Sequence, residues 1–287
     1  MKKVAKHPAF VLAADIGGTH ITTAVVDMSC YTVLQPTIVR QTLDSSGSAK
    51  SILQAWETAF RESLSRFGTN GLPIGIAMPG PFDYERGISL IQDQDKYDAL
   101  YGICVKDQLA EALDMRSDEI RMINDAAAFL QGEVFAGGHD RNDKVLGITL
   151  GTGLGSAVWK RGTGSRDAAL WDVPYQGSIM EESLATRWFV RQAEHRIGID
   201  VKGLKELLEL PNHNAVSGIL DEYSKHLLHF LGFFSEQESC RTFIIGGNIA
   251  KAWTRIRENF DQQFDQFHIH ISQLGEHAAL VGAATVF

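Results

Sequence analysis

The stretch AADIGGTHITTAVVD, residues 13–27, places a carboxylate and a pair of glycines between two apolar segments. The apolar segments predict two strands joined by a turn. In that turn Gly17 and Gly18 have no Cβ to block a ligand from the backbone amides, which can then bind phosphate. Thr19 adds a hydroxyl donor. Asp15 repels phosphate but suits Mg²⁺, which binds through one or two carboxylates together with substrate phosphates.

A second hairpin of this kind occurs in the other half of the chain, in LGTGLGSAVWK at 150–160. Its turn contains Gly151, Thr152 and Gly153. Recurrence of one such unit predicts two related domains that each offer a phosphate-binding turn to a cleft between them. Each turn taken alone is also compatible with an ordinary tight hairpin. A P-loop is excluded because G-x-x-x-x-G-K-[ST] is absent, and a Rossmann fingerprint because a strand, not a helix, follows the glycines.

Length and composition limit the classes of function. The chain has 287 residues, 44% of them hydrophobic, and a formal net charge of −8. An acidic chain without a basic cluster argues against a nucleic-acid partner, whose affinity comes from phosphate neutralisation. No apolar run is long enough to span a membrane, and no leader pattern is present. Three widely spaced cysteines predict free thiols, so we expect a cytoplasmic protein that acts on small molecules.

Two further stretches suggest chemistry. Asn124 and Asp125, in INDAAAFLQGE, are expected where a buried strand meets a helix. Asp125 could accept the proton of an attacking hydroxyl, as the catalytic aspartate of kinases does, or simply cap the helix. In FIIGGNIA, Gly246 and Gly247 would let a flat base approach the backbone, with Asn248 as a polar contact or cap. An ordinary strand-to-helix turn is the alternative there.

Strands and helices alternate along the whole chain, which is typical of an α/β architecture. Strands are expected over 10–15, 21–27, 72–78, 119–123, 144–150, 155–161 and 242–245, and helices over 48–67, 106–113, 125–136, 181–196, 204–208, 215–234, 249–267 and from 276.

Taken in order, these motifs resemble those of the ROK family of sugar kinases and span nearly the whole chain. They are D-I-G-G-T at 15–19, GIAMPGPFD at 75–83, N-D-A at 124–126, LGTGLG at 150–155, IGGNIA at 245–250 and AALVGAA at 278–284.

The resemblance implies an α/β fold of two actin-like (ribonuclease H-like) ATPase domains with a cleft between them. The small domain would comprise 1–123 and a returning helix in 275–287, and the larger domain 124–274. The resemblance also implies ATP-dependent phosphorylation of a hexose hydroxyl in the presence of Mg²⁺, and a homodimer. The sugar would be glucose-like or an N-acetylhexosamine.

Residue roles carry over by position. The resemblance makes Asp125 the catalytic base and Asn124 its sugar-binding neighbour. Gly80 and Pro81 match the rim of the sugar pocket, and Glu181 matches a sugar-binding glutamate. The implied ATP contacts are Asp15, which would hold Mg²⁺ directly or through water, Gly17, Gly18, Thr19, Gly151, Thr152, Gly153, Gly246, Gly247 and Asn248.

The chain also departs from the family pattern. Its segment 166–188 contains no cysteine or histidine where usual members have E-x-G-H and a zinc motif, so no structural zinc is expected. His20 and Ala127 replace a common lysine and asparagine, which leaves the sugar open. Asp93, Gln94 or Asp95 could contact the substrate.

The sequence is also compatible with two other functions. One is a sugar-binding pseudokinase. The other is a ROK-type transcriptional regulator without its DNA-binding domain, against which stand the acidic charge and the fourteen residues before Asp15, too few for a helix-turn-helix unit.

Overall fold

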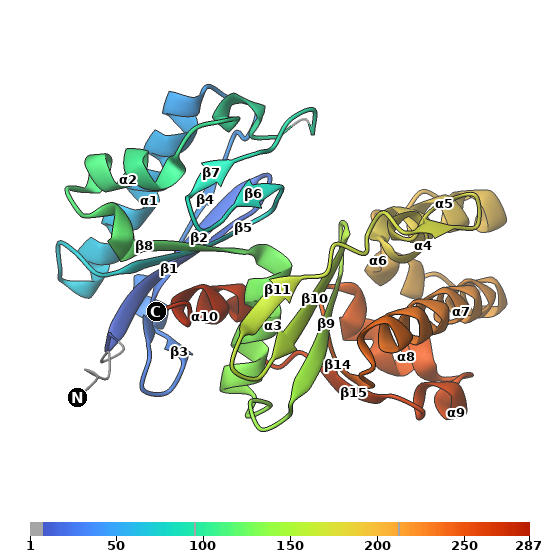
Figure 1. The fold of residues 1–287 in the computed structure, drawn as a ribbon. Coiled ribbons are helices and arrows are strands. Elements are labelled where there is room, and N and C mark those ends of the chain that lie inside the picture. The colour runs from blue at the N-terminus through green and yellow to red at the C-terminus, as the bar shows by residue number, and fades with distance from the viewer. Residues whose placement is uncertain (1–7, 95, 212) are drawn as a thin grey trace. The chain divides into compact units, whose positions relative to one another are not determined.

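The computed structural model describes residues 8–94, 96–211 and 213–287. The chain forms two compact units. Unit 1 comprises Met1–Asp140 and Glu276–Phe287, and unit 2 comprises Arg141–Gly275. Each unit contains a mixed sheet with helices packed against it (Figure 1), so the predicted α/β class is confirmed.

Unit 1 has a six-stranded sheet in the order β3-β2-β1-β5-β8, with β4 also paired to β2. The hairpin of β1 and β2 is antiparallel, whereas β5 and β8 run parallel to β1. The carboxyl ends of β1, β5 and β8 therefore lie at one edge. The strands of unit 1 are β1 (Phe10–Ile16), β2 (His20–Asp27), β3 (Thr32–Val33), β4 (Val39–Thr42), β5 (Ile74–Met78), β6 (Phe82–Asp83), β7 (Ile88–Ser89) and β8 (Ile120–Asn124).

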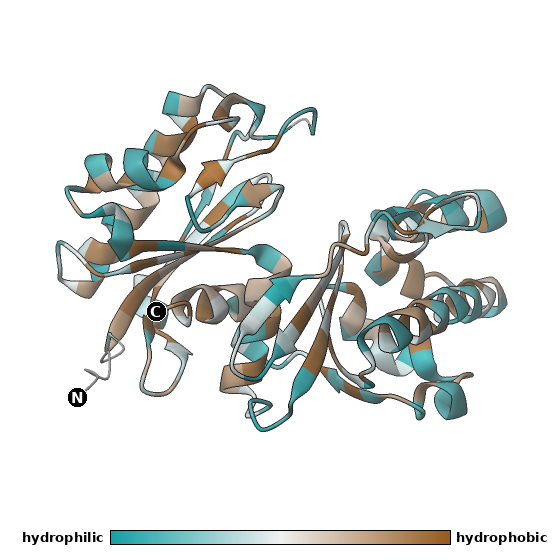
Figure 2. Ribbon diagram, viewed as in Figure 1, coloured by the Kyte–Doolittle hydropathy of each residue, from teal (hydrophilic) through white to brown (hydrophobic). Residues whose placement is uncertain are grey.

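Helices cover both faces of this sheet. The first, α1 (Ala49–Phe67), begins where Ser48 caps the amide of Ser51 and ends at Gly68, which has a left-handed φ of 86°. It packs its apolar side on one face together with α2 (Val105–Leu113), and Figure 2 shows hydrophilic residues interspersed along both helices. The other face receives α3 (Asp125–Ala136) and α10 (Ala278–Ala284). Short 3₁₀ helices are η1 (Gln35–Thr37), η2 (Asp98–Leu100), η3 (Ser117–Glu119) and η5 (Gly275–His277).

Glycine allows α3 and α10 to pack unusually close. A methyl group on Gly282 of α10 would lie 1.8 Å from the carbonyl oxygen of Ala128 in α3. Likewise, a methyl group on Gly75 of β5 would lie 1.9 Å from the carbonyl oxygen of Ala283. These contacts fix α3 to unit 1. The division of the chain thus differs from the predicted domain limits mainly in the segment that carries α3, which the sequence assigned to the second domain.

Unit 2 repeats the same central arrangement. Its five-stranded sheet has the order β11-β10-β9-β14-β15, in which β9 and β10 form an antiparallel hairpin and β14 is parallel to β9. The strands are β9 (Lys144–Leu150), β10 (Leu154–Lys160), β11 (Gly164–Asp167), β12 (Pro174–Tyr175), β13 (Ser178–Ile179), β14 (Thr242–Gly246) and β15 (His268–Ile271). The helices are α4 (Glu181–Leu184), α5 (Thr186–Ile197), α6 (Leu204–Leu208), α7 (His213–Glu238), η4 (Ile249–Ala252), α8 (Trp253–Arg257) and α9 (Asp261–Phe264).

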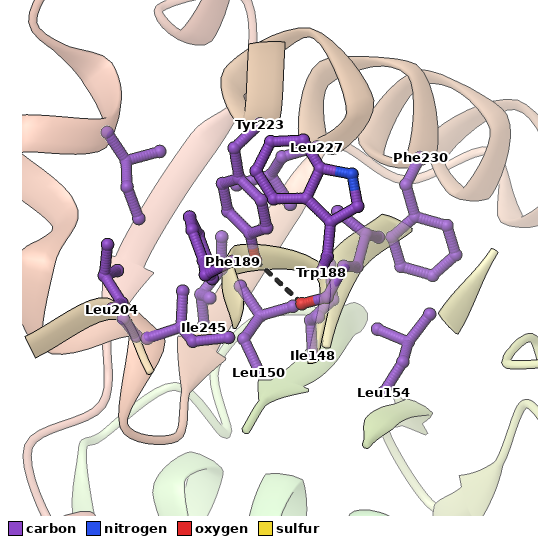
Figure 3. Close-up of a cluster of buried hydrophobic side chains, with 14 of the residues drawn as sticks. Ile148, Leu150, Leu154, Trp188, Phe189, Leu204, Tyr223, Leu227, Phe230 and Ile245 are labelled. Carbon is purple, nitrogen blue, oxygen red and sulfur yellow. Dashed lines mark hydrogen bonds between the residues drawn. The ribbon is translucent and has the colours of Figure 1, made fainter. Parts of the chain in front are cut away.

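Aromatic side chains of α5 and α7 form the core of unit 2. Trp188 and Phe189 meet Tyr223 and Phe230 above the apolar side chains of β9 (Figure 3). The Tyr223 hydroxyl donates a hydrogen bond of 3.0 Å to the carbonyl oxygen of Leu184, so its burial leaves no polar group unpaired.

The helix expected over 249–267 is the main error in secondary structure, because the structure breaks it into η4, α8 and α9. The break falls at Asn259 and Phe260. The Asn259 side chain donates to Asp221 on α7, and the Phe260 ring packs against the core. These tertiary contacts override the helical periodicity. No helix in the described part of the chain is long and apolar enough to cross a membrane.

The close packing of α10 yields a stability prediction. Gly282→Ala should lower the free energy of unfolding by at least about 2 kcal/mol, because the added methyl group overlaps a backbone carbonyl that can't move away. Gly232→Ala in α7 is the matched control, since nothing lies within 4 Å of the added methyl. That control should be neutral or stabilising by up to about 1 kcal/mol. Urea unfolding measures both, and equal stabilities for Gly282→Ala and wild type would contradict the packing argument.

Candidate active site

The register of the unit 1 sheet brings three predicted site segments to one edge. Asp15 is paired with Ala77, and Met78 is paired with Asn124. The glycine turn after β1, the Pro79–Pro81 loop after β5 and the start of α3 after β8 therefore emerge together. Carboxyl ends of parallel strands are where α/β proteins bind their ligands.

The turn after β1 has open amides, although not all those expected. Gly17 closes the turn, because its amide donates to the carbonyl oxygen of His20 at 2.9 Å. In the described part of the chain, the amides of Gly18 and Thr19 donate to no protein group. These two amides are thus the available donors for a phosphate, whereas the exposed Thr19 hydroxyl is hydrogen-bonded to Nδ1 of His20 at 2.9 Å.

Asn124 rather than Asp125 caps α3. The Asn124 side-chain oxygen accepts from the amide of Ala127 at 3.0 Å. Asp125 uses one carboxylate oxygen for the amide of Ala126 at 2.8 Å. The helix is therefore capped by Asn124 and not by Asp125. The carboxylate of Asp125 retains a second oxygen that can accept a proton. Burial raises the pKa of Asp125, and the Ala126 amide and the charge of Lys96 oppose that rise.

Asp15 is partly buried, and burial together with the charge of Asp125 raises its pKa to about 7. Arg40 opposes this rise and is itself ion-paired with Glu276 at 3.5 Å. Within the described residues, no hydrogen bond or ion pair joins Asp15 to another side chain. A carboxylate in that state fits a cation, and Mg²⁺ needs only one such protein ligand when phosphates and water supply the rest.

Tyr84 connects the sugar-site candidates of unit 1. Its hydroxyl donates to the carbonyl oxygen of Met78 at 3.0 Å and accepts from the Asn124 amide group at 3.3 Å. A methyl group on Gly80 would lie 3.1 Å from the same hydroxyl oxygen. Gly80 and Asn124 therefore lie on the same hydroxyl group, and Pro81, the next residue after Gly80, is exposed. Their expected contact with a sugar stays a prediction. The sequence offered no signal for Tyr84.

In unit 2, Glu181 supports the turn of Gly151–Gly153. The Gly151 amide closes the turn on the carbonyl oxygen of Gly153 at 3.1 Å, which leaves the amides of Thr152 and Gly153 without a protein acceptor in the described chain. Glu181 accepts from the amide of Leu154 at 2.8 Å and pairs with Arg187 at 2.6 Å. Both oxygens of this predicted sugar ligand are thus engaged next to the Gly151–Gly153 turn. Its expected contact with a sugar stays a prediction.

The predicted adenosine segment lies beside that turn. Gly246 is paired with Thr149 of β9, and a methyl group on Gly247, whose φ is 89°, would lie 2.2 Å from the carbonyl oxygen of Leu150. The glycine at 247 is therefore required by packing whether or not a base binds. Asn248 makes no side-chain cap, and its oxygen instead accepts from Lys251 at 2.8 Å.

The segment without the zinc motif is held by aromatic contacts. The Tyr175 hydroxyl is hydrogen-bonded to Nδ1 of His226 at 2.9 Å, and its ring stacks on His229 with centroids 4.7 Å apart. Burial lowers the pKa of His226, so the neutral ring is favoured. Among the described residues, no three His, Cys, Asp or Glu side chains are placed to hold a metal ion.

Sequence reasoning also missed Lys96 and Tyr97, which follow the suggested substrate contacts. Asp93 and Gln94 are exposed, and Asp95 lies outside the described residues. Tyr97 is fully buried and its hydroxyl donates to the carbonyl oxygen of Gly17, which ties this loop to the first phosphate turn.

The raised pKa of Asp15 predicts a dependence of stability on pH. The native carboxyl group binds its proton more tightly than the unfolded one, so the wild-type protein loses stability as the pH rises from 3.8 to about 7. Asp15→Asn removes this titration. The free energy of unfolding of this variant minus that of the wild type should therefore increase from pH 3.8 to about 7 and stay constant at higher pH. Urea unfolding of the metal-free proteins at several pH values measures this difference.

Asp27→Asn is the control of opposite sign. Hydrogen bonds from Ser29 lower the pKa of Asp27, so its carboxylate stabilises the fold above its unfolded pKa and the variant should lose stability there. An Asp15→Asn variant whose advantage doesn't change with pH would show that Asp15 titrates normally.

Comparison with known proteins gives the context of this geometry. The ROK family model matches residues 11–166. A glucokinase from Thermotoga maritima is 28% identical over 152 residues, which are 53% of this chain and 45% of that relative, so the chain matches less than half of the relative's length.

Solved structures match over almost the whole chain. An inorganic polyphosphate/ATP-glucomannokinase from Arthrobacter sp. strain KM is 25% identical, with 96% of this chain and 97% of that chain covered and a TM-score of 0.72. A ROK family glucokinase from Streptomyces griseus, in complex with glucose and AMPPNP, is 22% identical, with 96% and 98% covered and a TM-score of 0.75.

A ROK family transcriptional regulator, a homolog of the E. coli MLC protein, has 15% identity, coverage of 96% and 76%, and a TM-score of 0.74. The predicted fold of two actin-like α/β domains is confirmed by these likenesses. Since the family model covers more than half of the sequence, and the glycine turns and the Asn-Asp pair occupy the strand ends as the resemblance required, the chain belongs to the ROK family.

Proposed function

We propose that the protein is an ATP-dependent kinase that phosphorylates a hydroxyl group of a hexose or an N-acetylhexosamine. The observation that carries the proposal is the placement of Asp15 and Asp125 at one edge of the unit 1 sheet, beside a turn with two open amides. One carboxylate suits a cation and the other suits a proton acceptor. Membership of the family and the likeness to the glucokinase from Streptomyces griseus, which was solved with glucose and AMPPNP, support this assignment.

In this proposal the sugar hydroxyl attacks the γ-phosphorus of ATP. A bond forms between the sugar oxygen and that phosphorus, the bond to the bridging oxygen of ADP breaks, and Asp125 receives the hydroxyl proton. Asn124 and the Gly80–Pro81 loop, which share the contact with Tyr84, would hold the sugar. Phosphate oxygens would accept from the amides of Gly18 and Thr19.

In unit 2, the amides of Thr152 and Gly153 would bind phosphate oxygens, and Gly246 and Gly247 would border an adenine base. We propose that Asp15 holds Mg²⁺, which when bound neutralises charge on the phosphates. A homodimer and a cytoplasmic location belong to the same proposal, and light scattering tests the first of these.

A coupled assay of ADP release tests the function across glucose, mannose, fructose, N-acetylglucosamine and N-acetylmannosamine. We expect turnover with at least one of them, and a product that carries the γ-phosphate of ATP. Sugar binding without turnover for the whole panel would favour a pseudokinase. Sugar binding is measured beside turnover because the chain is also similar in structure to a ROK family transcriptional regulator.

Asp125→Asn tests the catalytic base. The amide oxygen of asparagine can still accept from Ala126, so the helix start should survive, but the side chain can no longer take a proton. We expect kcat to fall about 100-fold or more, with AMPPNP binding changed by less than about threefold. Asp27→Asn is the control, because Asp27 is paired with Phe10 at the amino end of β1, away from the carboxyl edge. A near-wild-type kcat for Asp125→Asn would remove Asp125 from this role.

A further inference from the structure

The loop before η2 brings a lysine to the carboxyl edge of unit 1. A methyl group on Gly18 would lie 3.9 Å from Cδ of Lys96, so the lysine stem runs beside the turn that has open amides. The positive charge of Lys96 also lowers the pKa of Asp125, against the effect of burial. Lys96 therefore lies near both the phosphate turn and the proposed base, although it is distant from each in sequence.

This position is fixed by the residue that follows. Tyr97 is fully buried and has a φ of 59°, a left-handed backbone that a bulky residue seldom adopts. Its amide donates to the carbonyl oxygen of Ser45 at 2.7 Å, and its hydroxyl donates to Gly17. Burial and the charge of Asp15 raise the pKa of Tyr97, so the hydroxyl keeps its proton. Lys96 is thus held at the turn through its neighbour.

The ammonium group of Lys96 has no direct partner among the described residues, although its charge acts on Asp125. Lys96 is partly buried, and within the described residues it makes no ion pair and no hydrogen bond. Several other basic groups of this unit have a direct partner. Arg40 pairs with Glu276, Lys106 donates to the carbonyl oxygen of Glu85, and His20 is hydrogen-bonded to Thr19. A partly buried lysine that makes no contact ion pair among the described residues, next to amides without acceptors there, indicates an anionic ligand.

We propose that Lys96 binds the phosphoryl group that is transferred, beside the Gly17–Thr19 turn. The inference rests on the proposed function and adds a specific ligand for the γ-phosphate. Phosphoryl transfer depends mainly on positioning and on neutralising charge at the equatorial oxygens. Because its stem is held along Gly18, a lysine there supplies one compact positive charge at little cost in ordering. Lys96 also opposes the negative charge of Asp125, which favours the ionised base.

Lys96→Met, Lys96→Arg and the control Lys50→Met test this role. Lys50 is an exposed lysine of α1, so its loss removes the same charge away from the site. Lys96→Met should lower kcat by about 10²- to 10³-fold, with the KM for sugar changed by less than about threefold. Lys96→Arg should retain most of the rate, and Lys50→Met all of it. Urea unfolding of each variant verifies that the fold is intact.

A binding measurement separates this inference from the proposed function. Calorimetry with ATP and with ADP, each with Mg²⁺, gives the ratio of the two dissociation constants. Because only ATP has the γ-phosphate, Lys96→Met should weaken ATP binding and leave ADP binding unchanged. That result supports the role of Lys96 even if no sugar in the panel is phosphorylated.

Three outcomes would overturn the proposed role of Lys96. The first is wild-type kcat and an unchanged ATP to ADP ratio in Lys96→Met, which leaves the kinase function standing. The second is an increase confined to the KM for sugar, which would assign Lys96 to the sugar. The third is failure of the wild-type protein to bind ATP, which would reject both proposals.

Discussion

The proposed chemistry depends on two carboxylates that share one edge of the unit 1 sheet, where burial limits their contact with water. Asp15 and Asp125 both have raised pKa values, in each case mainly because of burial, and the charge of Asp125 adds to the effect on Asp15. Two like charges so placed destabilise the fold at neutral pH. A cation at Asp15 and a cationic side chain near Asp125 would relieve this repulsion, so the unliganded site is arranged for partners of positive charge and for the phosphates they accompany.

The backbone makes this arrangement rigid. Gly282 and Gly75 let α10 approach α3 and β5 to distances that no side chain would permit, and α3 begins with Asp125. Because the capping task falls to Asn124, the carboxylate of Asp125 sits at a helix start, where the helix dipole favours negative charge, without being consumed as a cap. Small residues far from the chemistry thus determine where the proposed base lies.

The two glycine turns have similar sequences but different supports. In unit 1 a buried tyrosine, Tyr97, reaches the turn from a loop and donates to its carbonyl oxygen. In unit 2 a carboxylate, Glu181, accepts from the strand that leaves the turn and is itself held by Arg187. Each turn keeps two amides for a ligand because its first glycine amide closes the hairpin. Hairpin geometry, not composition alone, therefore sets the number of donors available for phosphate.

The sequence by itself determined the α/β class, the paired hairpins, the helices over 48–67 and 125–136 and the main site segments, because strand alternation, glycine turns and caps are local signals. It failed over 249–267, where contacts of Asn259 with another helix break the periodicity. Only the tertiary structure placed Lys96 beside Gly18, engaged Glu181 next to the Gly151–Gly153 turn and assigned α3 to the first unit. These facts depend on residues distant in sequence packing together, and the strength of such packing is not encoded in any short stretch of chain.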